Sequence, residues 1–138
     1  MSDNDETLRR HLRFGWLSLL IWLSMGLVLE ALHGFKVGFY LEVANSARRH
    51  LWTLAHSHGA LLAVVNLVYA WTSSRLQLPR ASSGMLMAAS LLMPLGFLLG
   101  GLSVHDGDPG VGVFLVPVGG VLLLGAVGLT AKAVWTSR

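Results

Sequence analysis

Four long apolar stretches divide this chain of 138 residues, and a helix of about 20 residues is long enough to cross the hydrocarbon core of a bilayer. The stretches are Phe14–His33, Leu51–Ser73, Gly84–His105 and Val111–Trp135. Charged residues make up 12% of the chain, whereas a soluble domain has about 25%. The sequence therefore predicts an all-α membrane protein, a four-helix antiparallel transmembrane bundle that forms a single domain over residues 1–138.

The first apolar stretch follows an acidic start that runs from Met1 to Glu6, and no small-residue cleavage site stands behind it. A secretory signal begins with basic residues and has a shorter apolar core. We therefore expect this stretch to be retained as a membrane helix.

Lysine and arginine are divided unevenly between the two ends of the predicted bundle. Seven lie in the N-terminal tail, the second link and the C-terminal end, namely Arg9, Arg10, Arg13, Arg75, Arg80, Lys132 and Arg138. Three lie in the first link, at Lys36, Arg48 and Arg49. Basic residues near helix ends favour the cytoplasmic side. We therefore expect both termini in the cytoplasm and the protein in the cell inner membrane, with its basic charge serving topology and not nucleic acid.

Five of the six histidines fall at the other end of the predicted bundle, which this orientation places on the periplasmic side. They are His33, His50, His56, His58 and His105. At about 1.5 Å of rise per residue, Glu30 comes to the same height as His58, so three helices bring His or Glu to one slab. Ionisable side chains at membrane depth indicate a functional site by default, because burying them is costly.

His56 and His58 lie two residues apart in one predicted helix, so their side chains are separated by about 200°. His56 shares its side with small or polar residues such as Gly59 and Asn66, which suits close helix packing. His58 shares its side with bulky residues such as Leu61, against which a planar cofactor could press. The sequence leaves open which of the two imidazoles is a ligand.

The chain has no cysteine, so any metal must use nitrogen or oxygen ligands. The candidate haem ligands are His58, His56, His105 and His33. A copper or zinc site would use the same histidines with Glu30 or Asp106, since imidazole suits both metals.

The histidines also have structural explanations that involve no cofactor. His33 and His50 would be interfacial residues, His105 would be a helix cap, and the His56–His58 pair would form interhelical hydrogen bonds. Glu30 and His33 also have Glu-x-x-His spacing, but a di-iron bundle needs a second such motif and two further Glu residues, and the sequence has no second Glu-x-x-His and only three Glu in all.

The segment His58-Gly59-Ala60-Leu61-Leu62 resembles the second helix of haem-copper oxidase subunit I, over about 20 residues. In that family, a histidine followed by Gly or Ala near the outer end of this helix is an axial ligand of the low-spin haem. The resemblance implies that His58 is a haem ligand, with His105 or His33 as the second. It extends neither to a dozen helices nor to the three copper-ligand histidines, so oxygen reduction is not implied.

Three functions follow from these patterns. The first is a small haem b protein for electron transfer or sensing. The second is a cofactor-free structural or assembly subunit, which would form a homo-oligomer or a larger membrane complex through glycine-rich helices. The third is a copper or zinc handling protein. No nucleophile and base pair can be argued from the sequence, so a stand-alone enzyme is not expected.

Overall fold

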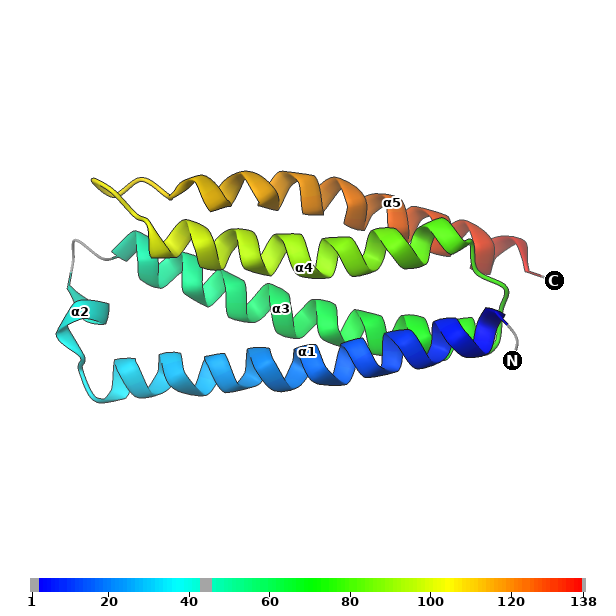
Figure 1. Ribbon diagram of the computed structural model, residues 1–138, viewed down its shortest axis with the longest axis horizontal. Coiled ribbons are helices and arrows are strands. Elements are labelled where there is room, and N and C mark those ends of the chain that lie inside the picture. Colours follow the sequence, from blue (N-terminus) through cyan, green and yellow to red (C-terminus); the bar gives the residue numbers. More distant parts are fainter. Residues whose placement is uncertain (1–2, 43–45, 138) are drawn as a thin grey trace.

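The computed structural model describes residues 3–42 and 46–137 and consists of four long helices (Figure 1). These are α1 (Asp3–Gly34), α3 (Ser46–Ser73), α4 (Arg80–Leu102) and α5 (Leu115–Thr136), the last preceded by the 3-10 helix η2 (Val111–Phe114). Successive long helices run in opposite directions, and each is long and apolar enough to cross a membrane. The predicted all-α, four-helix membrane bundle is confirmed.

The start of α1 and the end of α5 lie at the same end of the bundle, together with the link between α3 and α4 (Figure 1). We call this the terminal end. The opposite end carries the short helix α2 (Gly38–Leu41) and the link between α4 and α5. Arg138, which contributed to the predicted orientation, lies outside the described residues, and the cytoplasmic position of the termini stays a prediction.

The helix boundaries differ from the apolar stretches mainly at their starts. α1 begins at Asp3 instead of Phe14, and α3 begins at Ser46 instead of Leu51. Hydropathy marks the part of a helix that crosses the bilayer, and charged residues with good helix propensity continue the helix beyond it. α4 begins directly after Pro79 and ends at Leu102, so His105 lies outside the helix that was expected to end with it.

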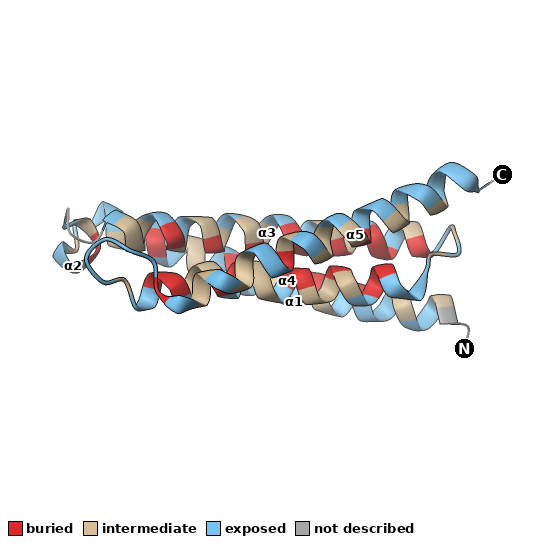
Figure 2. Ribbon diagram, turned by 90° about the horizontal axis from the view of Figure 1, so that it is seen from above, coloured by how far each residue is buried: buried red, intermediate tan, exposed pale blue. Residues whose placement is uncertain are grey.

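The helices pack in sequence order, α1 on α3, α3 on α4, and α4 on α5. Buried positions are concentrated on α3 and α4, whereas α5 buries Gly119 and Ala126 and its other residues are exposed or half-buried (Figure 2). The exposed apolar faces of α1 and α5 are those that lipid would cover.

Glycines set how closely neighbouring helices approach. A Cβ at Gly59 of α3 would overlap the indole of Trp22 on α1, and one at Gly26 of α1 would overlap the imidazole of His56 on α3. Between α4 and α5, Gly96 and Gly119 make equivalent close contacts with the facing helix. Small residues of this kind let helix backbones approach closely in membranes, where burial of apolar surface does not drive association. The side chains of Trp22 and His56 therefore pack into space that glycines on the facing helix leave open.

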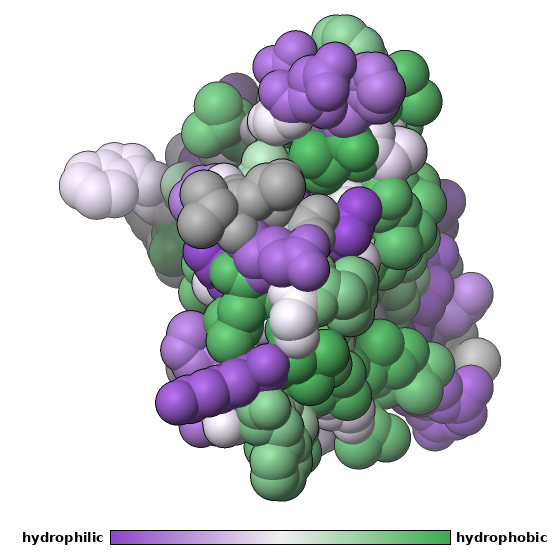
Figure 3. Space-filling view, turned by 90° about the vertical axis from the view of Figure 1, so that its left-hand side faces the viewer, coloured by the Kyte–Doolittle hydropathy of each residue, from purple (hydrophilic) through white to green (hydrophobic). Residues whose placement is uncertain are grey.

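Two arginines of α3 bind backbone carbonyls of α2 and α4 at the opposite end of the bundle. Arg48 donates to the carbonyl of Gly101 in the last turn of α4 (3.1 Å), and Arg49 donates to the carbonyls of Tyr40 and Leu41 at the end of α2. These bonds satisfy carbonyls that have no partner within their own helix. Figure 3 faces this end, where hydrophilic and hydrophobic side chains are mingled.

The link between α4 and α5 forms a tight turn. Asp106 and Gly107 have positive φ angles of 49° and 87°, and His105 and Asp108 exchange two backbone hydrogen bonds. The left-handed conformation is strain-free for glycine and tolerated by Asp. His105 therefore lies in this turn and not in α4.

Gly59→Ala should lower the free energy of unfolding by about 1–3 kcal/mol, because the added methyl group displaces Trp22 from the α1–α3 contact. Reversible unfolding in mixed micelles measures the change. Gly120→Ala is the matched control, since a Cβ there meets nothing within 4 Å. Equal effects at both positions would show that Gly59 matters through helix propensity and not through packing.

Candidate functional site

A groove of about 440 Å³ lies between α1, α2 and α3 at the opposite end of the bundle. It is lined by Gly26, Leu29, Glu30, His33, Gly34, Tyr40, Thr53 and His56. Three of the predicted ligands, Glu30 and His33 from α1 and His56 from α3, therefore face one hollow. Glu30 and His33 are exposed at its rim, whereas His56 is half-buried.

His56 is held at one ring nitrogen by the backbone of α1. Its Nδ1 donates to the carbonyl oxygen of Trp22 at 2.7 Å. The imidazole reaches this carbonyl because Gly26, one turn further along α1, has no side chain to cover it. A carbonyl accepts and does not donate, so in the neutral ring the proton is on Nδ1 and Nε2 carries a lone pair. Within the described part of the chain, no hydrogen-bond partner meets this Nε2.

His58 points to a different neighbour. Its Nδ1 donates to the carbonyl of Leu54 in its own helix (2.9 Å), and its ring packs against Phe97 of α4 with centroids 4.9 Å apart. The two imidazoles therefore diverge, as their angular separation predicted, His56 to α1 and His58 to α4. Both keep Nδ1 bound to a carbonyl, but His56 is the one that lines the groove.

The other predicted ligands lie apart from this groove. His105 and Asp106 form a pair in the α4–α5 turn, with 3.3 Å between Nε2 and Oδ2 and side chains 91% and 88% exposed. His50, which was not among the predicted ligands, is exposed near the start of α3. Among the described residues, no three His, Asp or Glu side chains converge as a ready metal-ligand set. Haem makes a smaller demand, since its porphyrin supplies four nitrogens and the protein one or two axial ligands.

The most buried histidine is His11, at the terminal end, which the sequence analysis did not include among the candidates. Its Nδ1 lies 2.7 Å from Asn66 Oδ1 on α3, and its Nε2 lies 2.8 Å from Ser83 Oγ on α4. Its side chain is fully enclosed, and its ring stands 4.4 Å from that of Tyr69. One imidazole thus joins three helices.

Hydrogen-bond directions in this network are fixed by Asn66. Its amide nitrogen donates to the Leu62 carbonyl (2.8 Å) and to Ser90 Oγ (2.7 Å), so its oxygen accepts from His11 Nδ1. Nε2 of the neutral ring then accepts from the Ser83 hydroxyl, whose oxygen accepts from Arg10 (2.9 Å). Every donor in this network has an acceptor, so burying these polar groups costs little free energy of folding. Both nitrogens of His11 are occupied, unlike those of His56.

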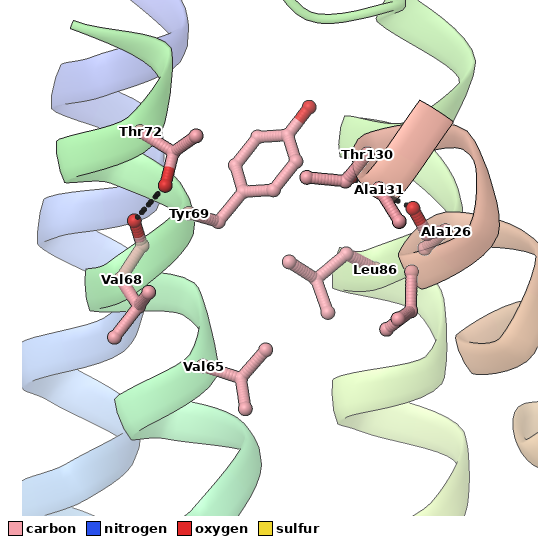
Figure 4. Close-up of a pocket in the computed structure, with 9 residues that line it drawn as sticks. Val65, Val68, Tyr69, Thr72, Leu86, Ala126, Thr130 and Ala131 are labelled. Atoms are coloured by element: carbon pink, nitrogen blue, oxygen red, sulfur yellow. Dashed lines mark hydrogen bonds between the residues drawn. The ribbon is translucent and has the colours of Figure 1, made fainter. Parts of the chain in front are cut away.

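A second hollow of about 220 Å³ lies between α3, α4 and α5 and is lined almost wholly by apolar atoms (Figure 4). Tyr69 stands between it and the network, with its hydroxyl 2.8 Å from Ser82 Oγ. The walls otherwise consist of side chains such as Val65, Leu86 and Ala126. A hollow with this apolar lining can hold an acyl chain, but it provides no side chain suited to binding a metal.

The chain matches no protein-family model, no curated protein sequence and no solved structure.

A double-mutant cycle of His11→Phe and Asn66→Leu should give a coupling free energy of about 1 kcal/mol, the scale of interhelical hydrogen bonds in membranes. Unfolding in mixed micelles of the two single variants, the double variant and the parent measures it. Thr53→Val is the control, because Thr53 bonds within its own helix and should show no coupling to His11→Phe. Additive effects of His11→Phe and Asn66→Leu would contradict a shared network.

Proposed function

We propose that the protein is a small membrane protein that binds haem b in the groove between α1 and α3, with Nε2 of His56 as an axial ligand. One observation carries this proposal: the His56 imidazole is anchored at Nδ1 by the Trp22 carbonyl and lines the groove with a lone pair on its other nitrogen. Histidine ligands of metals almost always donate their second ring N–H to a carbonyl or carboxylate, which fixes their tautomer and orientation.

The surroundings of His56 support the same assignment. Leu29 and Tyr40, both buried, give the groove an apolar wall against which a porphyrin face can pack. His33 lies at its rim and is the candidate for the second axial ligand. His105 is a weaker candidate, since it lies in the α4–α5 turn with Asp106. His58 remains the ligand that the oxidase resemblance implies, so the two assignments make opposite predictions.

Electron transfer or haem sensing is the role that suits such a site, because an open groove leaves a porphyrin edge near the surface. The groove lies at the end opposite the termini. With both termini in the cytoplasm, this end faces the periplasm, and the proposed partner is a redox protein or a haem carrier on that side.

A cofactor-free subunit of a larger membrane complex is the second candidate. A Cβ at Gly120 or Gly128 of α5 would meet no other atom within 4 Å. Gly119 and Gly125, in contrast, pack against α4. Open glycines on an exposed membrane helix suit close approach by a further helix. This candidate requires no ligand at His56.

Protein purified in detergent from haem-replete cells should show a Soret absorbance band, which His56→Ala abolishes and His58→Ala retains. The two histidines share a helix and a carbonyl-bonded Nδ1, so they form a matched pair that differs in the neighbour each ring faces. Size-exclusion chromatography and helical circular dichroism check that each variant is folded.

Loss of the band in His58→Ala alone would contradict the groove and support the ligand implied by the resemblance. Colourless protein containing stoichiometric copper or zinc would replace haem with a metal held by His56, His33 and Glu30 after side-chain rearrangement. Colourless, metal-free protein that co-purifies with a partner would favour the subunit.

A further inference from the structure

The terminal end carries two adjoining hollows between α1 and α4 that share Glu6 and Arg10. The larger, of about 530 Å³, is lined by Glu6, Arg9, Arg10, Arg13, Phe14, Leu17 and Met87. The smaller, of about 360 Å³, is lined by Glu6, Thr7, Arg10, Arg80, Ser83 and Gly84. Four arginines therefore surround the pair with one glutamate among them, which makes this a cationic site.

The lining of the larger hollow changes from polar to apolar along α1. Arg9, Arg10 and Arg13 form its polar part, and Phe14 and Leu17 follow one turn further along the same helix face. Met87 of α4 closes the apolar part from the other side. The change falls where the apolar stretch of the sequence begins, so the hollow crosses the level at which lipid headgroups give way to acyl chains.

Arg10 is held in place before any ligand arrives. Its Nη2 donates to Ser83 Oγ at 2.9 Å, and Ser83 is itself buried and bonded to His11. A guanidinium has five N–H donors, so this bond leaves others for a phosphate oxygen. An oriented arginine loses less side-chain freedom on binding than one on an open surface.

We propose that this groove binds one anionic phospholipid, with the phosphate on Arg9, Arg10 and Arg13 and an acyl chain along Phe14, Leu17 and Met87. Basic pockets between membrane helices recognise anionic headgroups in this way. A free phosphate would satisfy the arginines but would leave the apolar wall uncovered. The lipid uses both parts of the hollow, and it bridges α1 and α4 beside the His11 network. This site shares no lining residue with the proposed haem groove at the opposite end.

Native mass spectrometry of the full chain tests the site by comparing retention of phosphatidylglycerol and phosphatidylcholine with identical acyl chains. We expect the parent protein to retain one phosphatidylglycerol in preference to phosphatidylcholine by about fivefold or more, since several arginines contribute. Arg9→Gln/Arg13→Gln should reduce this preference to near unity. Both side chains are exposed, and Arg10 is kept so that the hydrogen bond to Ser83 remains.

Arg75→Gln/Lys132→Gln is the matched control, because it removes the same charge from the terminal end outside the hollow. It should retain the parent's preference. An equal loss in the control would overturn the site and leave general attraction to basic residues. Displacement of the lipid by millimolar glycerol 1-phosphate would also overturn it, since the apolar wall would then contribute nothing. A parent protein without headgroup preference would overturn it independently of any variant.

Discussion

Close approach of helix backbones is the constraint on which the rest of this fold depends. In a bilayer an apolar side chain gains little by exchanging lipid for a neighbouring helix, so association relies on packing and polar contacts. Trp22 lies against Gly59 and His56 against Gly26, so these two contacts match large side chains to glycines in the register that α1 and α3 adopt. That register brings the Trp22 carbonyl to the His56 imidazole, and so the packing that holds the pair together also determines the tautomer of the candidate ligand.

The two ends of the α1–α3 pair use histidine in opposite ways. His11 has both nitrogens engaged, by Asn66 and by Ser83, and is enclosed within the bundle. An imidazole in that state joins helices and has no lone pair left for a metal. His56 has one nitrogen engaged and a hollow beside it. Burial alone would rank His11 first as a functional residue; counting the occupied nitrogens reverses the order.

The sequence was sufficient for the helices and for the divergence of His56 and His58, because hydropathy and helical geometry are local properties. It could not indicate that His56 and not His58 faces the groove with His33, since that depends on the register between α1 and α3. His11 was missed because it precedes the apolar stretch and lies among arginines, a pattern typical of a solvated helix end. The sequence signal for this network was Asn66 and Ser90, because polar side chains inside apolar helices need hydrogen-bond partners on neighbouring helices. His105 was placed in a helix that ends at Leu102, because the turn begins earlier than the charged residues that mark it.

α1 is the element whose position both proposed ligands would stabilise. It packs along α3 and reaches α4 through Arg10 and His11 at the terminal end, where both side chains meet Ser83. A lipid between α1 and α4 and a porphyrin between α1 and α3 would each bind the docked arrangement and not one in which α1 has moved away. Ligands that bind the same conformation favour it together, by mass action. The two proposed ligands would therefore favour the same position of α1, although they would bind at opposite ends of it.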